Sequence, residues 1–247
     1  MSTATQSQRH VPEHFPLVYA DILSQAVTGE LIGMQNYASL VEICESVEDM
    51  KDAVEHSASE MGHAVAFQSA AQDIGVPVIV NPSANYWGRI RAAFLEHVRA
   101  GDYSACLIIQ EVMLESFAVS MYKAIAEVTE GEVGRIFGEI GTEEESHLEH
   151  AIEELQEELE VDRDAFEDKV HALHRQVMTI LAEMVSAKDP AGHCELCAGD
   201  CVKDSLDQIG LSSAILRGKA LNFYLSTLDR IGVRGEKSLE WVANLPA

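Results

Sequence analysis

Two glutamate–histidine pairs carry the most chemical information in the sequence, because each places a carboxylate and an imidazole three residues apart. They are Glu60 with His63 and Glu144 with His147. Residues three apart on a helix lie on nearly the same face, so both side chains of a pair can reach one metal ion. One such pair alone does not indicate a metal site, because a helical glutamate is usually solvated and a single histidine is usually a core or surface residue.

The two pairs belong to a pattern that occurs twice. Glu30 precedes Glu60 by 30 residues, Glu115 precedes Glu144 by 29, and the two copies are offset by 85 and 84 residues. About 30 residues allow a helix to run to the end of a bundle, turn and return to the same level. Two such hairpins that face each other bring four carboxylates and two imidazoles together, which is the ligand set of a dinuclear carboxylate centre in a four-helix bundle.

The donor atoms also indicate the kind of metal. Carboxylate and imidazole ligands suit iron or manganese, and the absence of thiolate from the set argues against structural zinc. The run from Cys106 to Glu115 is mostly apolar, so an acid within it needs a partner. We therefore predict a dinuclear metal centre with six ligands, which are Glu30, Glu60, His63, Glu115, Glu144 and His147.

The elements that would position these ligands are helices. No proline lies between Ser83 and Asp189, and this stretch is rich in Ala, Glu, Leu and Ile, a composition that favours helices. The sequence predicts an all-α protein, a four-helix bundle with additional C-terminal helices, in a single domain over residues 1–247. We expect helices over residues 17–45, 47–74, 84–100, 102–129, 132–160, 163–187, 202–231 (broken near 210) and 236–244.

Local signals support several of these boundaries. Gly75 is expected to end one helix, and Asp102 and Asp162 are expected to cap the start of two others. The β-branched run Val76–Val80 is short and contains a proline, so we expect a connection there rather than a strand.

Charge and hydropathy exclude several function classes. The 247 residues include 17 Lys and Arg against 41 Asp and Glu, a formal net charge of −24. Nucleic-acid binding and attachment to an anionic membrane both need a cationic face, so neither is expected. We find no apolar run of about 18–20 residues, the length that spans a bilayer. Residues 1–16 are polar and lack the apolar stretch of a signal peptide, so we expect a cytoplasmic protein with no transmembrane segment.

The sequence resembles the cyanobacterial aldehyde-deformylating oxygenases, also called fatty aldehyde decarbonylases, which are ferritin-like dinuclear iron proteins. The resemblance runs from about residue 30 to 160 and returns weakly near 225–242. The segments that carry it are Gly29-Glu30, Asn36-Tyr37, Glu60-Met-Gly-His63 with Phe67, Cys106-Leu-Ile-Ile-Gln110 leading to Glu115-Ser-Phe-Ala-Val-Ser-Met-Tyr122, and Glu144-Glu-Ser-His147-Leu148.

The resemblance implies a ferritin-like fold, and the family's six iron ligands fall on the six residues already named. It implies that two iron ions take up O2 and electrons from a ferredoxin-type donor, and that a long-chain aldehyde is cleaved to a hydrocarbon and formate. The apolar faces of the first, second and fourth helices are then expected to line a slot for a small apolar substrate. Apart from the resemblance, two interpretations of Gln110 and Tyr122 stay open: contact with the metal ligands from outside, or simple packing.

The sequence departs from the family in three places. Between Glu30 and Asn36 it reads Leu-Ile-Gly-Met-Gln, where the family is more polar and has a histidine. The family pattern lacks the stretch around His193 to Cys201, and residues 162–225 match poorly. These departures keep two alternatives open. One is another oxidase or hydroxylase reaction on the same diiron centre, and the other is a rubrerythrin- or ferritin-like protein for peroxide removal or iron handling.

A cysteine-containing insertion at about residues 188–203 allows three interpretations. It places three thiols and an imidazole within nine residues, at His193, Cys194, Cys197 and Cys201. The spacing fits a second metal site, a redox pair such as a Cys194–Cys197 disulfide, or a loop with incidental thiols. The sequence does not decide among the three, and it leaves the oligomeric state open.

Overall fold

The computed structural model describes residues 16–83, 85–186 and 206–246, and within these ranges the chain forms helices and turns without a β-strand. The all-α prediction is therefore confirmed. In chain order the elements are α1 (Pro16–Leu40), α2 (Val47–Ile74), α3 (Asn85–Ala100), α4 (Tyr103–Leu107), η1 (Ile108–Glu115), α5 (Ser116–Val128), α6 (Gly131–Val161), α7 (Arg163–Leu173), η2 (His174–Met178), α8 (Thr179–Ser186), η3 (Leu206–Ile209), α11 (Ser213–Ile231) and α12 (Gly235–Ala243).

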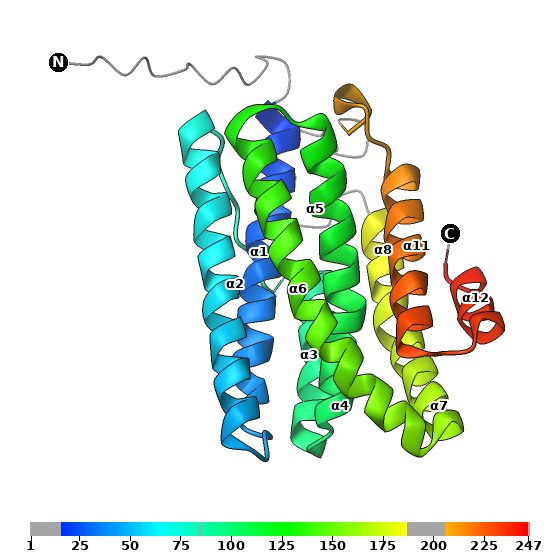
Figure 1. The fold of residues 1–247 in the computed structure, drawn as a ribbon. Helices are drawn as coiled ribbons and strands as arrows, with labels where there is room; N and C mark the ends of the chain where they lie inside the picture. Colours follow the sequence, from blue (N-terminus) through cyan, green and yellow to red (C-terminus); the bar gives the residue numbers. More distant parts are fainter. Residues whose placement is uncertain (1–15, 84, 187–205, 247) are drawn as a thin grey trace.

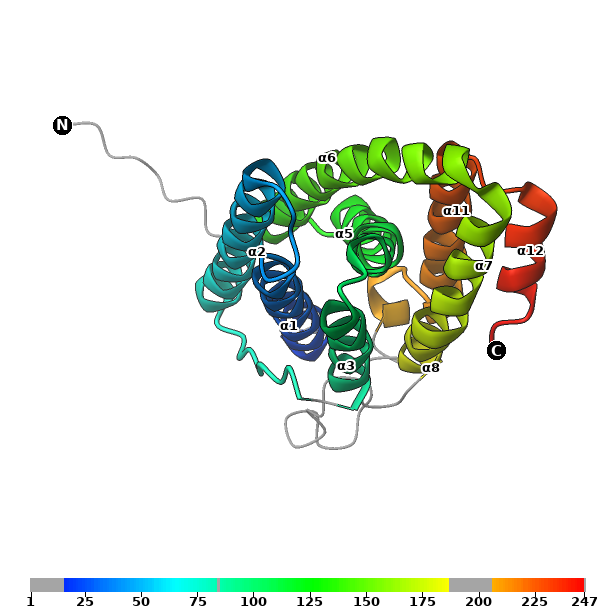
Figure 2. The same ribbon diagram turned by 90° about the horizontal axis from the view of Figure 1, so that it is seen from below.

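Two helical hairpins build the bundle. α1 packs along α2, and the continuous helix formed by α4, η1 and α5 packs along α6, so the four long helices lie side by side (Figure 1). α11 then covers α5, and α3 and α8 close the remaining side. Seen along the bundle, α5 lies in the middle of the ring formed by the other helices (Figure 2).

The predicted helix ends are set by local chemistry. Gly75 ends α2 with φ 73°, a left-handed conformation that glycine adopts without steric penalty. Asp102 accepts a hydrogen bond from the Ala105 amide at 3.2 Å, and Asp162 accepts one from Ala165 at 3.0 Å. The first helix ends at Leu40, earlier than expected, because the chain turns before Ser46 caps α2.

The central helix contains an irregularity that the sequence pattern did not predict. Between Ile108 and Glu115 the backbone is a π-helix, and all eight of its residues are buried. π segments of this kind are rare and occur frequently at functional sites, because the wider turn redirects side chains. Here the turn directs both Gln110 and Glu115 inward, and their side chains are hydrogen-bonded to each other.

One stretch of the central helix, Tyr103–Val128, has the length and the apolar composition of a membrane-crossing helix. The buried core helix of a soluble protein can have the same composition. Within this stretch, 72% of the most apolar window is buried inside the protein. A helix surrounded by other helices is apolar on every side, so its place at the centre of the bundle explains the composition.

The core consists of two apolar clusters with a polar layer between them. On α1, α2, α6 and the central helix (α4, η1 and α5) the apolar core residues toward one end of the bundle belong to a cluster that includes Leu23, Phe67 and Phe137. Toward the other end they belong to a cluster that includes Phe94 and Ile109. Between the two clusters each of the four helices carries a buried glutamate, and these are Glu30, Glu60, Glu115 and Glu144.

Candidate metal centre

Four predicted ligands form one compact group. Glu30 from α1, Glu60 and His63 from α2, and Glu144 from α6 each offer a donor atom, and these atoms all lie within 4.8 Å of one another. None of the four residues is more than 5% exposed. Two helical hairpins therefore deliver donors to one buried point, as the repeated spacing predicts.

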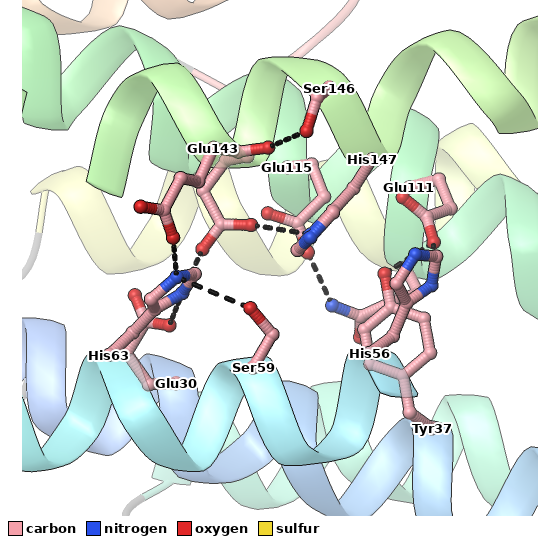
Figure 3. A network of polar contacts seen from close by, with 12 residues as sticks. Glu30, Tyr37, His56, Ser59, His63, Glu111, Glu115, Glu143, Ser146 and His147 are labelled. Carbon is pink, nitrogen blue, oxygen red and sulfur yellow. Dashed lines mark hydrogen bonds and ion pairs between the residues drawn. The ribbon is translucent and has the colours of Figure 1, made fainter. Parts of the chain in front are cut away.

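His63 is oriented by acids on both ring nitrogens. Its Nδ1 lies 2.9 Å from Glu144 Oε1 and 3.2 Å from Glu30 Oε2, so this nitrogen faces the group of donors. Its Nε2 lies 2.9 Å from the exposed carboxylate of Glu143 (Figure 3). A carboxylate on the outer nitrogen of a histidine fixes the ring orientation and raises its basicity as a ligand.

Glu115 and His147 lie outside that compact group, and His147 is joined to it through Glu144. His147 Nδ1 is 3.0 Å from Glu144 Oε2, while the other Glu144 oxygen faces His63. Glu115 is 3% exposed and projects from the end of the π segment. The Glu144 carboxylate thus lies between the two histidines, with one oxygen directed at His63 and the other at His147.

Burial and mutual repulsion control the protonation of the cluster. Burial, followed by the charges of Glu144, Glu115 and Glu30, holds the pKa of Glu60 well above its usual range. Burial and the neighbouring carboxylates likewise raise the pKa of Glu30 and the pKa of Glu115. Without cations, this part of the protein favours protonated carboxyl groups.

The histidines act in the opposite direction. Burial disfavours the imidazolium, but hydrogen bonds to Glu144 and Glu30 raise the pKa of His63 to about 11. Burial also opposes ionisation of Glu144, yet hydrogen bonds from His147 and His63 lower its pKa to about 2. Glu144 is therefore ionised in the metal-free protein, and its negative charge is balanced by the protonated histidines.

Two local observations show that the cluster fits a bound cation. Glu60 Oε1 is buried and has no hydrogen-bond partner among the described residues, a costly state for a carboxylate oxygen. Gly33 on α1 faces the same carboxylate, and a Cβ at this position would lie 2.6 Å from Glu60 Oε2. The glycine leaves room for that carboxylate, and a cation would satisfy its unpaired oxygen. This buried group of glutamates and histidine can therefore hold a metal.

The predicted outer residues contact the carboxylates. Gln110 Nε2 donates to Glu115 Oε1 at 2.7 Å, and the Tyr122 hydroxyl donates to Glu30 Oε1. Tyr122 is also packed against Phe67 and Phe137. Each of the two carboxylates is thus held by a polar side chain of the central helix.

Sequence reasoning missed a second polar group beside the cluster. Glu111, 1% exposed, accepts a hydrogen bond from the Tyr37 hydroxyl and lies 3.7 Å from His56 Nδ1. The His56 ring is 4.4 Å from that of His147 (Figure 3). Glu111 stands in the same apolar run as Glu115, so the argument used for Glu115 applied equally to it. Glu143 was also missed, and nothing in the sequence distinguishes this exposed acid from its neighbours.

An apolar cavity of about 170 Å³ reaches the cluster. Its polar end is lined by Glu30, Glu60 and Glu115, and its walls come from α1, α5, α6, α8 and α11. The expectation that the second helix lines the slot is wrong except for Glu60, because no other residue of α2 lines the cavity. Helices from the C-terminal half take its place.

The three glycines near the ligands have different environments. A Cβ on Gly29 would lie 3.2 Å from the Trp87 ring, so close packing explains this glycine. Gly33 instead makes room for the Glu60 carboxylate. A Cβ on Gly62 would have no neighbour within 4 Å, so packing does not explain Gly62.

The cysteine cluster of His193, Cys194, Cys197 and Cys201 lies outside the described residues. The two other cysteines, Cys44 and Cys106, are buried free thiols far from one another in sequence. Burial raises the pKa of Cys106 to about 12, so this thiol is not a reactive nucleophile at neutral pH.

Comparison with known proteins identifies the family of this arrangement. Residues 13–211 match the family model described as long-chain fatty aldehyde decarbonylase, which covers well over half of the chain. The chain belongs to the long-chain fatty aldehyde decarbonylase family. The match confirms the resemblance noted from the sequence and extends it beyond residue 160. As a decarbonylase family member, the chain is an enzyme.

A solved structure supports the fold of this decarbonylase family member. It is described as protein 19 with aldehyde deformylating oxidase activity from Synechococcus, and it is 18% identical in sequence to this chain. The superposition covers 92% of this chain and 97% of that one, with a TM-score of 0.73. The likeness therefore includes the C-terminal helices that complete the cavity, a region in which the sequence resemblance was weak.

Proposed function

We propose that this protein is an oxygen-dependent, dinuclear iron enzyme that cleaves an apolar aldehyde to a hydrocarbon and formate. The observation that carries the proposal is the apolar cavity whose polar end is formed by three of the buried glutamates. An iron store or a peroxidase needs no such space, whereas an alkyl substrate does. Family membership supports the aldehyde as the reacting group.

The six residues Glu30, Glu60, His63, Glu115, Glu144 and His147 are the ligands in this proposal. Two iron ions bound there, reduced by an external donor of the ferredoxin type, would supply Lewis acidity and the electrons for O2 activation. Carboxylates and imidazoles are suitable ligands for iron, and manganese would fit the same set.

The protein's own groups position the substrate and limit access of water. The aldehyde end would lie beside Glu30, Glu60 and Glu115, while the alkyl chain would lie along the apolar wall of the cavity. Tyr122 lines the cavity and its hydroxyl donates a hydrogen bond to Glu30, so it would hold the Glu30 carboxylate in place at the polar end of the cavity. Glu143 keeps His63 Nδ1 directed inward by occupying the other ring nitrogen.

The cavity has room for part of an alkyl chain. Its volume of about 170 Å³ is close to the ~150 Å³ that holds one benzene-sized molecule. A second cavity of about 20 Å³ shares Phe117, Leu181 and Val185 with the first. These three side chains separate the two spaces, and a longer alkyl chain would have to displace them. We propose that a long-chain aldehyde is the substrate, as family membership supports, and that the enzyme acts in the cytoplasm.

The proposal is tested by giving reduced, iron-loaded protein O2, an electron donor and a series of linear aldehydes from six to eighteen carbons. We expect equal amounts of formate and of a hydrocarbon one carbon shorter than the aldehyde. Oxidised or hydroxylated products without formate would instead favour a different diiron oxygenase. Rapid peroxide consumption with no change in any aldehyde would favour the iron- or peroxide-handling alternative.

A further inference from the structure

A half-buried arginine is connected to the predicted centre through two buried amides. Arg91 on α3 donates from Nη1 to Asn36 Oδ1 at 2.9 Å and from Nη2 to Ser39 Oγ at 2.7 Å. Asn36 Nδ2 donates to Gln110 Oε1 at 2.6 Å, and Gln110 Nε2 donates to Glu115 Oε1 at 2.7 Å. Three helices thus contribute to one chain of hydrogen bonds that ends on a proposed metal ligand.

The donors and acceptors in this series of hydrogen bonds can be arranged in only one way. Arginine can only donate, so the Asn36 carboxamide must turn its oxygen toward Arg91 and its NH2 toward Gln110. Gln110 must in turn direct its oxygen toward Asn36 and its NH2 toward Glu115. Asn36 is 0% exposed and Gln110 is 3% exposed, so water does not compete for these groups. The orientation of the Gln110 amide therefore depends on a residue that does not touch it.

Arg91 has an unusual environment for a cation in so acidic a protein. Within residues 16–83, 85–186 and 206–246 it makes no ion pair, and its hydrogen bonds go to two neutral side chains. Burial, followed by the charge of Arg99, lowers the pKa of Arg91. A buried cation without a carboxylate partner polarises the hydrogen bonds that leave it. Here that polarisation runs toward Glu115.

We propose that Arg91 is a positioning residue for the metal centre, which acts through Asn36 and Gln110 to hold the Glu115 carboxylate in its ligand orientation. This inference rests on the proposed function, because it takes Glu115 to be a ligand. Residues that orient metal ligands from outside typically contribute about 10- to 100-fold to metal affinity. Gln110 contacts the ligand Glu115 directly, and Arg91 acts on Gln110 through Asn36.

The test is a cobalt(II) titration of the metal-free full-length protein, followed by visible absorption, which reports the ligand geometry of each ion. We expect wild type to bind two ions, and Arg91→Met to bind one of them about tenfold more weakly with an altered spectrum. Arg91→Lys should recover part of this loss, because an ammonium group can still donate to Asn36. Arg89→Met is the matched control, since Arg89 is on the same helix and pairs with Glu183 at 2.5 Å on the surface.

Asn36→Asp gives the sharpest result, because it preserves the side-chain volume and the contact with Arg91 but cannot donate to Gln110. The Gln110 amide must then turn and present its oxygen to Glu115, so we expect weaker cobalt binding. An added negative charge acting only through space would strengthen it. Wild-type affinity and spectrum in both Arg91→Met and Asn36→Asp would overturn the inference and leave the proposed function intact. Absence of cobalt binding by wild type would overturn both.

Discussion

Four carboxylates share one buried layer in this protein. Glu144 contacts both His63 and His147, whereas Glu30 contacts His63 alone. Glu60 has a buried oxygen without a hydrogen bond and a raised pKa. We predict that Glu60→Gln makes the metal-free protein more stable at neutral pH by about 1–2 kcal/mol, because glutamine removes the cost of protonating this buried carboxyl group. The same variant should lose the stabilisation that iron gives to wild type. Urea unfolding of both proteins, with and without iron(II), measures the two effects.

The exposed substitution Glu183→Gln is the control for Glu60→Gln. It removes a surface ion pair with Arg89, and such a change should shift stability by less than about 0.5 kcal/mol under either condition. Destabilisation of the metal-free protein by Glu60→Gln, together with normal iron binding, would show that Glu60 has a structural role only.

The pKa directions in the cluster predict how the metal-free protein responds to pH. Glu30, Glu60 and Glu115 have raised pKa values, so the stability they contribute is complete below about 4.5 and is lost as pH rises. His63, with a pKa of about 11, contributes stability below 6.5 that is lost toward pH 11. Glu144, with a pKa of about 2, contributes stability above 4.5 that is lost as pH falls.

We therefore expect the stability of the metal-free protein to be greatest near pH 5 and to decrease toward pH 8. Iron should reverse this dependence, because metal binding releases protons and becomes stronger as pH rises. Thermal unfolding between pH 5 and 8, with and without iron(II), checks both trends. Stability of the metal-free protein that rises with pH over this interval would contradict the assigned protonation.

At the scale of the helices, the sequence predicted most boundaries because they depend on local chemistry. Gly75, Asp102 and Asp162 act within a few residues of themselves. The π segment could not be predicted in this way, because it depends on a central helix that is enclosed on all sides. The spacing of the glutamates was informative because helices of similar length return to the same level of the bundle. Within each hairpin, the residues at that level therefore recur after about 30 positions in the sequence.

Two glycines near the ligands give a matched pair of substitutions. A Cβ on Gly33 would lie 2.6 Å from Glu60 Oε2 and 3.3 Å from Gln110 Nε2, whereas a Cβ on Gly62 would meet nothing within 4 Å. Both glycines lie within helices, where alanine is favoured by roughly 0.5–1 kcal/mol. We predict that Gly62→Ala gains this stability and keeps two iron ions, while Gly33→Ala displaces the Glu60 carboxylate and loses iron. Iron content and urea unfolding of the two variants provide the comparison.

At the scale of the whole molecule, the cavity depends on helices that lie in a part of the sequence where the family resemblance is weak. α8 and α11 contribute Leu181, Met184 and Leu216 to its wall. These helices lie within and beyond residues 162–225, where the family pattern is hard to read. Tertiary packing joins them to the ligands, and no local spacing records that packing. The bundle and the ligand spacing could therefore be predicted, and the cavity could not.

Filling the cavity should change the substrate range without disturbing the metal. Ala118 lines the cavity on α5 and touches none of the proposed ligands in the contacts described above. We predict that Ala118→Phe keeps two iron ions per chain but lowers kcat/KM for the longest accepted aldehydes by at least about tenfold relative to the shortest. The exposed substitution Ala243→Phe is the control. A uniform decrease for all chain lengths would indicate that the cavity does not hold the alkyl chain.

The central claim is that two helical hairpins hold a pair of metal ions at the polar end of this cavity. The most direct measurement is a crystal structure of the iron-loaded protein with anomalous diffraction data collected on both sides of the iron absorption edge. We predict two anomalous peaks within bonding distance of Glu30, Glu60, His63, Glu115, Glu144 and His147. No peak between these side chains, or iron found only elsewhere in the molecule, would contradict the claim.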